Sequence, residues 1–112
     1  MKKAMHPDDL GKFFMERANS GDVEGIIALY ESDAILALPS GEVANGAMNI
    51  RRFFEGLLTN KQSFQGEVRS SLINGELALT STRFPGGATA EVARRQTDGS
   101  WLWLIDQPKV LG

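Results

Sequence analysis

The amino-acid sequence predicts an α+β fold in which N-terminal helices pack against an antiparallel sheet. Apolar residues recur at helical spacing through the first half of the chain. The second half instead alternates apolar and polar residues, and it is interrupted by three hairpin-turn sequences, Asn74-Gly75, Pro85-Gly86-Gly87 and Asp98-Gly99. The chain has 112 residues with no repeat or linker, so we expect one domain over 1–112, with 1–7 as a loose tail.

Three helical segments are expected before the sheet. The first begins at Pro7-Asp8-Asp9, because proline and acidic side chains favour a helix N-terminus. The second runs from Val23 to Tyr30, and we expect Asp22 to cap it. A short strand, Ala34 to Leu38, separates it from the third helix, Ala47 to Thr59. The helices together present one apolar face to the rest of the domain.

Four strands are expected after these helices. They are Ser63 to Ile73, Leu77 to Phe84, Thr89 to Thr97 and Ser100 to Asp106. Because the turns between them are short, the order predicts an antiparallel meander.

Composition excludes several classes of function. A net charge of −2 and a pI near 5.3 give no electrostatic reason to bind nucleic acid. The chain has no cysteine and a single histidine, His6, so we expect no metal site and no cofactor. The opening segment is not a signal peptide and no apolar run is long enough to cross a bilayer, so we expect no membrane partner and a cytoplasmic location.

A specific pattern runs from Asn19 to Gly56, and the order and spacing of its parts matter more than any one of them. Its marks are the turn at Asn19, Gly21 and Asp22, the aromatic Tyr30, Asp33-Ala34 before the strand, Pro39 and Gly41 after it, Gly46, and the Ile50–Phe54 helix sequence. With the late Arg94–Trp101 segment, this pattern resembles the NTF2-like superfamily, near its SnoaL-like, ketosteroid isomerase-like and DUF4440-type members. The resemblance implies a cone-shaped, cystatin-like fold whose curved sheet wraps the helices and encloses a small-molecule pocket. It also implies a homodimer through the sheet face.

Three positions argue against the isomerase reaction itself. Where the resemblance places the proton-shuttling carboxylate, the tyrosine and the neutral aspartic acid of ketosteroid isomerases, this chain has Leu38, Phe14 and Ala93. Leucine and phenylalanine cannot transfer or share a proton. We therefore expect a related protein that is not a true ketosteroid isomerase.

The resemblance implies which strand side chains face inward: Leu36 and Leu38 from the first strand, and Leu79, Ser81 and Arg83 from the hairpin. Glu91, Ala93 and Arg95 share a face of the next strand, and Trp101, Trp103 and Ile105 share a face of the last.

This facing gives a candidate binding site. Within it, Arg83 and Arg95 are the expected oxyanion ligands, with Glu91 as their partner or as a base. The alternative is that both arginines lie on the open sheet face or at the cavity mouth, paired with Glu91 and Glu67. Asp106 joins the cavity only if the opposite face of the last strand points inward. The expected site residues are Phe14, Tyr30, Leu36, Leu38, Phe54, Arg83, Glu91, Arg95 and Trp103.

Two functions remain open from the sequence. The first is a protein that binds or converts a small, largely apolar ring compound bearing an oxyanion group. As an enzyme it would act without a cofactor, as an isomerase, cyclase or dehydratase. The second is a non-catalytic association or protein-binding module, favoured by apolar residues on both faces of the last strand. We expect a homodimer in either case.

Overall fold

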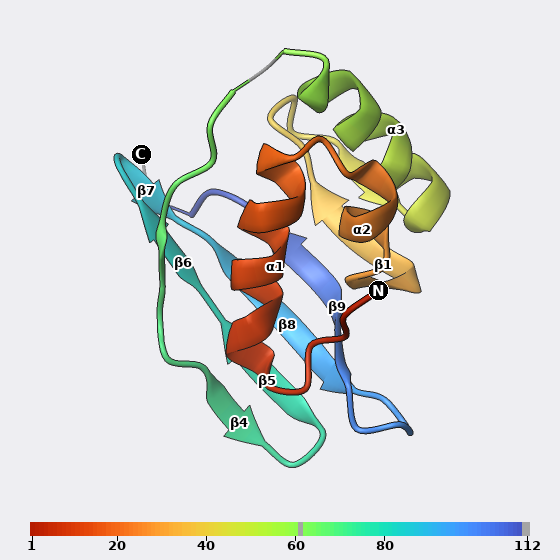
Figure 1. Ribbon diagram of the computed structural model, residues 1–112, viewed down its shortest axis with the longest axis vertical. Helices are drawn as coiled ribbons and strands as arrows, with labels where there is room; N and C mark the ends of the chain where they lie inside the picture. The colour runs from red at the N-terminus through yellow and green to blue at the C-terminus, as the bar shows by residue number, and fades with distance from the viewer. Residues whose placement is uncertain (61, 111–112) are drawn as a thin grey trace.

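The structure, a computed structural model, describes residues 1–60 and 62–110. It confirms the α+β fold: three helices, α1 (Pro7–Asn19), α2 (Val23–Ile27) and α3 (Ala47–Leu58), lie against a large and mostly antiparallel sheet (Figure 1). In Figure 1, α1 crosses in front of the central strands, and α3 lies toward the end of the sheet that holds β1 (Tyr30–Ala37). This one-sided cover divides the sheet into an inner face and an outer face.

Local signals set the helix boundaries. His6 and Asp9 form a reciprocal capping box: His6 Nδ1 accepts the Asp8 N–H at 3.2 Å, and the Asp9 carboxylate accepts the His6 N–H at 3.3 Å. Asp22 caps α2 as expected, accepting the Gly25 N–H at 2.9 Å. The second helix is shorter than expected, because Tyr30 begins β1. Among the described residues, no helix combines the length and the apolar character needed to span a bilayer.

The main sheet has six strands in the order β2-β1-β9-β8-β5-β4, and a smaller sheet has the order β3-β6-β7. Strand β1 runs parallel to β9, and every other pairing is antiparallel. The strands β4, β5, β8 and β9 therefore keep the expected meander order, while β2 forms between the expected strand Ala34–Leu38 and the third helix, where no strand was expected. The remaining bounds are β2 (Val43–Asn45), β3 (Glu67–Val68), β4 (Leu72–Asn74), β5 (Leu77–Thr80), β6 (Thr82–Phe84), β7 (Gly87–Ala88), β8 (Ala90–Arg95) and β9 (Trp101–Gln107).

The expected strand from Leu77 to Phe84 is broken at Ser81 into β5 and β6. The Ser81 hydroxyl donates to the Thr89 carbonyl at 2.7 Å, and the Thr89 hydroxyl accepts the Thr82 N–H at 2.8 Å. These side-chain bonds stand in place of regular ladder bonds at the break. The two halves of the strand therefore belong to different sheets. The alternation of inward and outward side chains does not continue from one half to the other.

A bulge in β9 decides which of its side chains face the helices. The pairing with β8 shifts between Val92 opposite Ile105 and Ala93 opposite Trp103. Because a bulge adds one residue to one strand, it reverses the alternation beyond it. Ile105, expected to share a face with Trp103, is 44% exposed on the outer face, and Asp106 is buried on the inner face.

The segment before α1 is docked onto the domain, which corrects the expectation of a loose tail over residues 1–7. Ala4 is 2% exposed, and its carbonyl accepts the Trp101 N–H at 2.8 Å. Pro7 is also buried. The segment therefore contributes to the core at the start of β9.

Candidate functional site

The interior of the cone is a cluster of aromatic rings between the helices and the inner face of the sheet. Tyr30 and Trp103, neighbours on β1 and β9, have ring centroids 5.4 Å apart. Phe54 from α3 lies 6.3 Å from Tyr30, and Phe14 from α1 lies 6.3 Å from Trp103. Phe14 and Phe54 close the ring of contacts at 5.7 Å. Four elements thus build one continuous apolar wall.

Two carboxyl groups are buried beside these rings. Glu91 on β8 and Asp106 on β9 face each other in the strand register, and they are only 5% and 7% exposed. Residues opposed in an antiparallel pair have Cβ atoms about 5 Å apart. None of the ion pairs of residues 1–60 and 62–110 includes either carboxyl group. Two acidic groups therefore share an apolar site without a compensating cation.

Burial raises the pKa of both carboxyl groups, because an apolar site disfavours the charged form. For Asp106, burial and the nearby Glu91 charge raise the pKa from 3.8 to about 8. For Glu91, burial again raises the pKa, but hydrogen bonds from the Thr80 and Thr89 hydroxyls oppose the rise. At neutral pH, Asp106 is therefore predominantly protonated.

Hydrogen bonds from side chains satisfy the two carboxyl groups. The Tyr30 hydroxyl donates to Asp106 Oδ2 at 2.5 Å. The Thr80 hydroxyl donates to Glu91 Oε1 at 2.6 Å and accepts the Trp103 indole N–H at 3.0 Å. Burial is the main cause that raises the pKa of Tyr30 well above its usual value, followed by the Asp106 charge. Tyr30 therefore stays a hydroxyl donor throughout the pH range of interest.

The arginines expected in the cavity lie outside it. Arg95 is exposed near the end of β8 and forms an ion pair with Glu76, because the strand runs past the helices at this point. Arg83 is exposed on β6, beyond the strand break at Ser81. These positions correct the expectation that Arg83 and Arg95 bind an oxyanion inside the cone.

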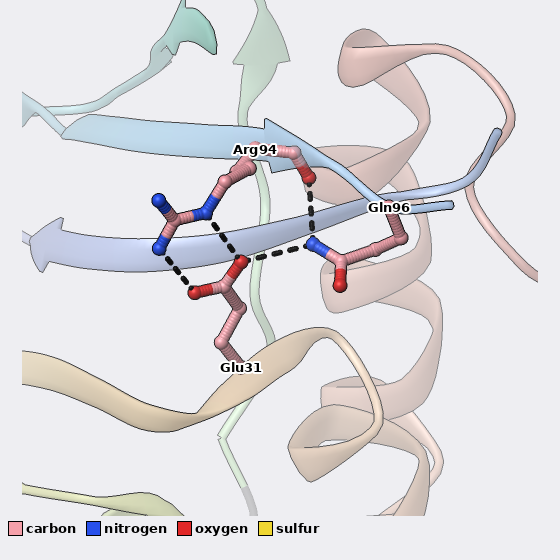
Figure 2. Close-up of polar contacts among 3 residues, drawn as sticks. All are labelled: Glu31, Arg94 and Gln96. Carbon is pink, nitrogen blue, oxygen red and sulfur yellow. Dashed lines mark hydrogen bonds and ion pairs between the residues drawn. The ribbon is translucent and has the colours of Figure 1, made fainter. Parts of the chain in front are cut away.

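Arg94 has a bonding pattern of its own on the outer face. Its Nη2 and Nε donate to the two carboxylate oxygens of Glu31 at 2.8 and 2.9 Å (Figure 2). The Gln96 amide also donates to Glu31 at 2.9 Å. Figure 2 shows this pair reaching from β1 to β8 across β9. The Arg94 hydrogen bond is the main cause that lowers the pKa of Glu31. The ion pair links β1 to β8 across β9.

Two surface hollows lie away from the carboxyl pair. An open groove of about 910 Å³ is bordered by β3, β6 and β7, with Arg69 and Arg83 among its lining residues. A hollow of about 350 Å³ lies between the N-terminal segment and the start of β9, with Lys3 and Asp98 on its wall. Neither hollow is lined by Glu91 or Asp106. We place the candidate site at the carboxyl pair because two opposed, buried carboxyl groups with raised pKa values are typical of functional sites.

The sequence identified part of this site. Leu36 is fully buried on β1 opposite Asp106, and Leu38 is half-buried against the core. Thr80 was missed as a site member, and Asp106 was expected in the cavity only on the alternative facing of the last strand. The run Asp106-Gln107-Pro108 at the end of an apolar strand was the available signal for Asp106. The expected residues that the structure brings together are Phe14, Tyr30, Leu36, Phe54, Glu91 and Trp103.

A cone of this architecture, with helices on one face of a curved, mostly antiparallel sheet, defines a protein of the NTF2-like, cystatin-like class. The sequence model of the SnoaL-like domain matches residues 12–110, so the chain belongs to the SnoaL-like family. A comparison with curated proteins found no match.

Solved structures show the same fold at low sequence identity. A ketosteroid isomerase-like protein from Erwinia carotovora atroseptica is 16% identical, with a TM-score of 0.78 over 94% of each chain. A Thiobacillus denitrificans protein, assigned as a calcium/calmodulin-dependent protein kinase type II association domain, is 12% identical, with a TM-score of 0.79 over 96% of this chain and 98% of that chain. A Nostoc punctiforme domain of unknown function with a cystatin-like fold is 16% identical, with a TM-score of 0.77 over 91% of this chain and 73% of that chain. At these identities the likeness concerns the fold alone.

Proposed function

We propose that this protein binds a small, largely apolar ring compound in the cone and moves a proton on it with the Asp106–Glu91 pair. The observation that carries the proposal is the burial of two opposed carboxyl groups without a cation, against a wall of aromatic rings. The reaction needs no cofactor, since it uses an acid and a base that the chain itself supplies.

Stability alone gives a poor reason for the pair. Buried ionisable groups are often replaced by apolar residues of similar size without loss of stability. At Glu91 and Asp106, burial raises the pKa of both carboxyl groups, and hydrogen bonds from different hydroxyl groups oppose the rise at each of them. Titratable neighbours with separated proton affinities are suited to act as acid and base at one pH.

The surroundings of the pair indicate the class of compound. Phe14, Phe54 and Trp103 offer ring faces and edges but no charge, which favours an apolar, planar or cyclic body. A protonated Asp106 offers an O–H donor to a carbonyl or enolate oxygen, and Glu91 offers an acceptor for a proton on a neighbouring carbon. The compound we propose is therefore a ring ketone or phenol and not a strongly charged acid.

Access to the pair requires side chains at the rim to move. Phe53 and Phe64 are half-buried, and each makes an edge contact with an inner ring: Phe53 with Phe54 at 5.3 Å, and Phe64 with Phe14 at 5.8 Å. These are the next rings outward from the cluster beside the carboxyl groups. We propose that a ligand takes the place of one of them, because exchanging one apolar contact for another costs little.

The proposal is tested by a thermal-shift screen of ring ketones, phenols and aromatic carboxylates. A compound present at 100 times its dissociation constant adds about 2.7 kcal/mol, which is a rise of several degrees for a domain of this size. We expect a ketone or phenol to give this rise with the wild type and with Arg95→Ala, and to lose it with Asp106→Leu, which removes the polar group at similar volume. A rise that survives in Asp106→Leu and disappears in Arg95→Ala would contradict the proposal.

A second function is favoured by the outer face of the sheet. Leu72, Leu79, Val92, Ile105 and Ile35 are consecutive register partners across β4, β5, β8, β9 and β1. At about 4.8 Å per strand this apolar row is about 19 Å long. Leu72, Leu79 and Ile105 are 72%, 49% and 44% exposed. A row of this kind suits a copy of itself across a two-fold axis, so we propose a homodimer through this face.

The two functions do not compete for residues. The apolar row lies on the outer face, and the carboxyl pair lies on the inner face of the same strands. A dimer with a functional cone in each protomer is therefore the form that we propose.

A further inference from the structure

We propose that Trp103 and Thr80 are positioning residues that assign the shared proton of the carboxyl pair to Asp106 and keep Glu91 as the base. The inference deepens the proposed function, because it names which carboxyl group has which role in that site. Hydrogen-bond direction supports it, through a chain of donors that runs from Trp103 through Thr80 to Glu91.

The chain starts at the indole of Trp103, whose N–H can only donate. It donates to the Thr80 hydroxyl oxygen at 3.0 Å inside the core. The Thr80 hydroxyl then directs its own proton to Glu91 Oε1, 2.6 Å away. Because the Thr80 oxygen accepts the indole N–H, its own proton is directed to Glu91, and a hydroxyl donor stabilises Glu91 as a carboxylate.

A second hydroxyl acts on Glu91 in the same sense. The Thr89 oxygen accepts the Thr82 backbone N–H at 2.8 Å, so its proton is also free for an acceptor. A hydrogen bond from this hydroxyl lowers the pKa of Glu91.

Asp106 has a weaker set of donors. Among residues 1–60 and 62–110, its side chain has one hydrogen-bond partner, the Tyr30 hydroxyl at 2.5 Å. One hydroxyl donor lies within hydrogen-bond distance of each carboxyl group, Thr80 for Glu91 and Tyr30 for Asp106, and the Thr89 hydroxyl also lowers the pKa of Glu91. Because the two carboxyl groups are opposed and buried, they share one proton at neutral pH, and this imbalance assigns it to Asp106.

The other groups around the pair do not alter the assignment. The side chains from the helices, Phe14 and Phe54, carry no charge. Tyr30 from β1 stays protonated, and Thr80 from β5 does not titrate. The proton therefore has only two sites, and the hydroxyl directions decide between them.

The test is a pH titration of the ligand-free protein, with the carboxyl carbons of Asp and Glu labelled with ¹³C and followed by NMR. In the wild type, we expect Glu91 to titrate below Asp106. Thr80→Val replaces the hydroxyl by a methyl group, and Trp103→Phe removes the indole N–H. Losing a hydrogen bond to a charged group corresponds to about one pH unit or more, so we expect the Glu91 midpoint to rise and the Asp106 midpoint to fall by that amount in Thr80→Val.

Thr80→Ser is the matched control, because it keeps the hydroxyl and should retain the wild-type midpoints. Unchanged midpoints in Thr80→Val would overturn the inference. A wild-type titration in which Glu91 binds the last proton would also overturn it, even if no variant folds. Neither measurement needs a ligand, so a failure of the proposed small-molecule function and a failure of the proton assignment are distinguishable.

Discussion

Asp106→Asn is expected to make the protein more stable than the wild type at pH 9 and to remove most of its pH dependence above pH 5. The folded pKa of Asp106 is about 8, against an ordinary value of 3.8. Between these values, the folded state holds a proton that the unfolded state has released. Stability therefore falls as the pH rises through this window, by about 1.4 kcal/mol per pH unit. Asparagine keeps an acceptor for the Tyr30 hydroxyl but does not titrate.

The measurement is the free energy of unfolding in urea for the wild type and the variant between pH 4.5 and pH 9. The difference between them should grow in favour of Asp106→Asn as the pH rises. Glu16→Gln, which changes an exposed carboxylate on α1, is the matched control and should follow the wild type. Parallel curves for the wild type and Asp106→Asn would show that Asp106 ionises normally, and the account of the pair would then be wrong.

Leu79→Glu is expected to convert a dimer into a monomer. Leu79 lies in the apolar row of the outer face, between its register partners Leu72 and Val92. Across a two-fold axis the substitution introduces two like charges into one buried surface. A buried charge without a partner costs several kcal/mol, which weakens association by a factor of a thousand or more.

Sedimentation equilibrium or light scattering, measured over a range of protein concentrations, reports this change. Met48→Glu is the control: its side chain is 66% exposed on α3, on the helical side of the sheet. We expect this variant to remain dimeric. A wild type that is monomeric at every concentration tested would remove the basis for the homodimer.

The order of elements was predictable from the sequence because each signal is local. The Asp22 cap, the Asn74-Gly75 turn and the helical spacing of Ile50 and Phe54 each act within a few residues. The parallel pairing of β1 with β9 was not predictable from them. It joins Tyr30 to Trp103, 73 residues further along the chain, and no turn specifies it.

The site was predictable only where strand alternation is unbroken. Glu91 and Ala93 on β8 were expected to face inward, and both are buried. Thr80 was missed because the strand is broken at Ser81, so the side chains of β5 alternate independently of those of β6. Leu79, expected to face inward, is exposed on the outer face, and its neighbour Thr80 is buried. Asp106 was expected in the cavity only if the opposite face of the last strand pointed inward, and the β9 bulge after Trp103 brings it to the inner face. Side-chain hydrogen bonds cause the first irregularity, and residue spacing does not reveal either of them.

Charge was the other misleading signal. Arginines near an apolar strand suggested an oxyanion site, but Arg95 instead binds Glu76, and Arg83 is exposed on β6. Both charges therefore lie at the surface, where guanidinium groups remain hydrated. The polar groups inside the cone are carboxyl and hydroxyl groups, and the chemistry that we propose is proton transfer for that reason.

The most direct test of this central claim is hydrogen–deuterium exchange on a bound ring ketone. The ketone from the thermal screen is incubated with the protein in D₂O, and loss of the proton beside its carbonyl is followed by ¹H NMR. We predict faster exchange with the wild type than in buffer, and a drop of about 100-fold or more in Glu91→Gln, because a positioned general base contributes this much. Equal exchange rates in the wild type and Glu91→Gln, with the ketone bound to both, would contradict the account.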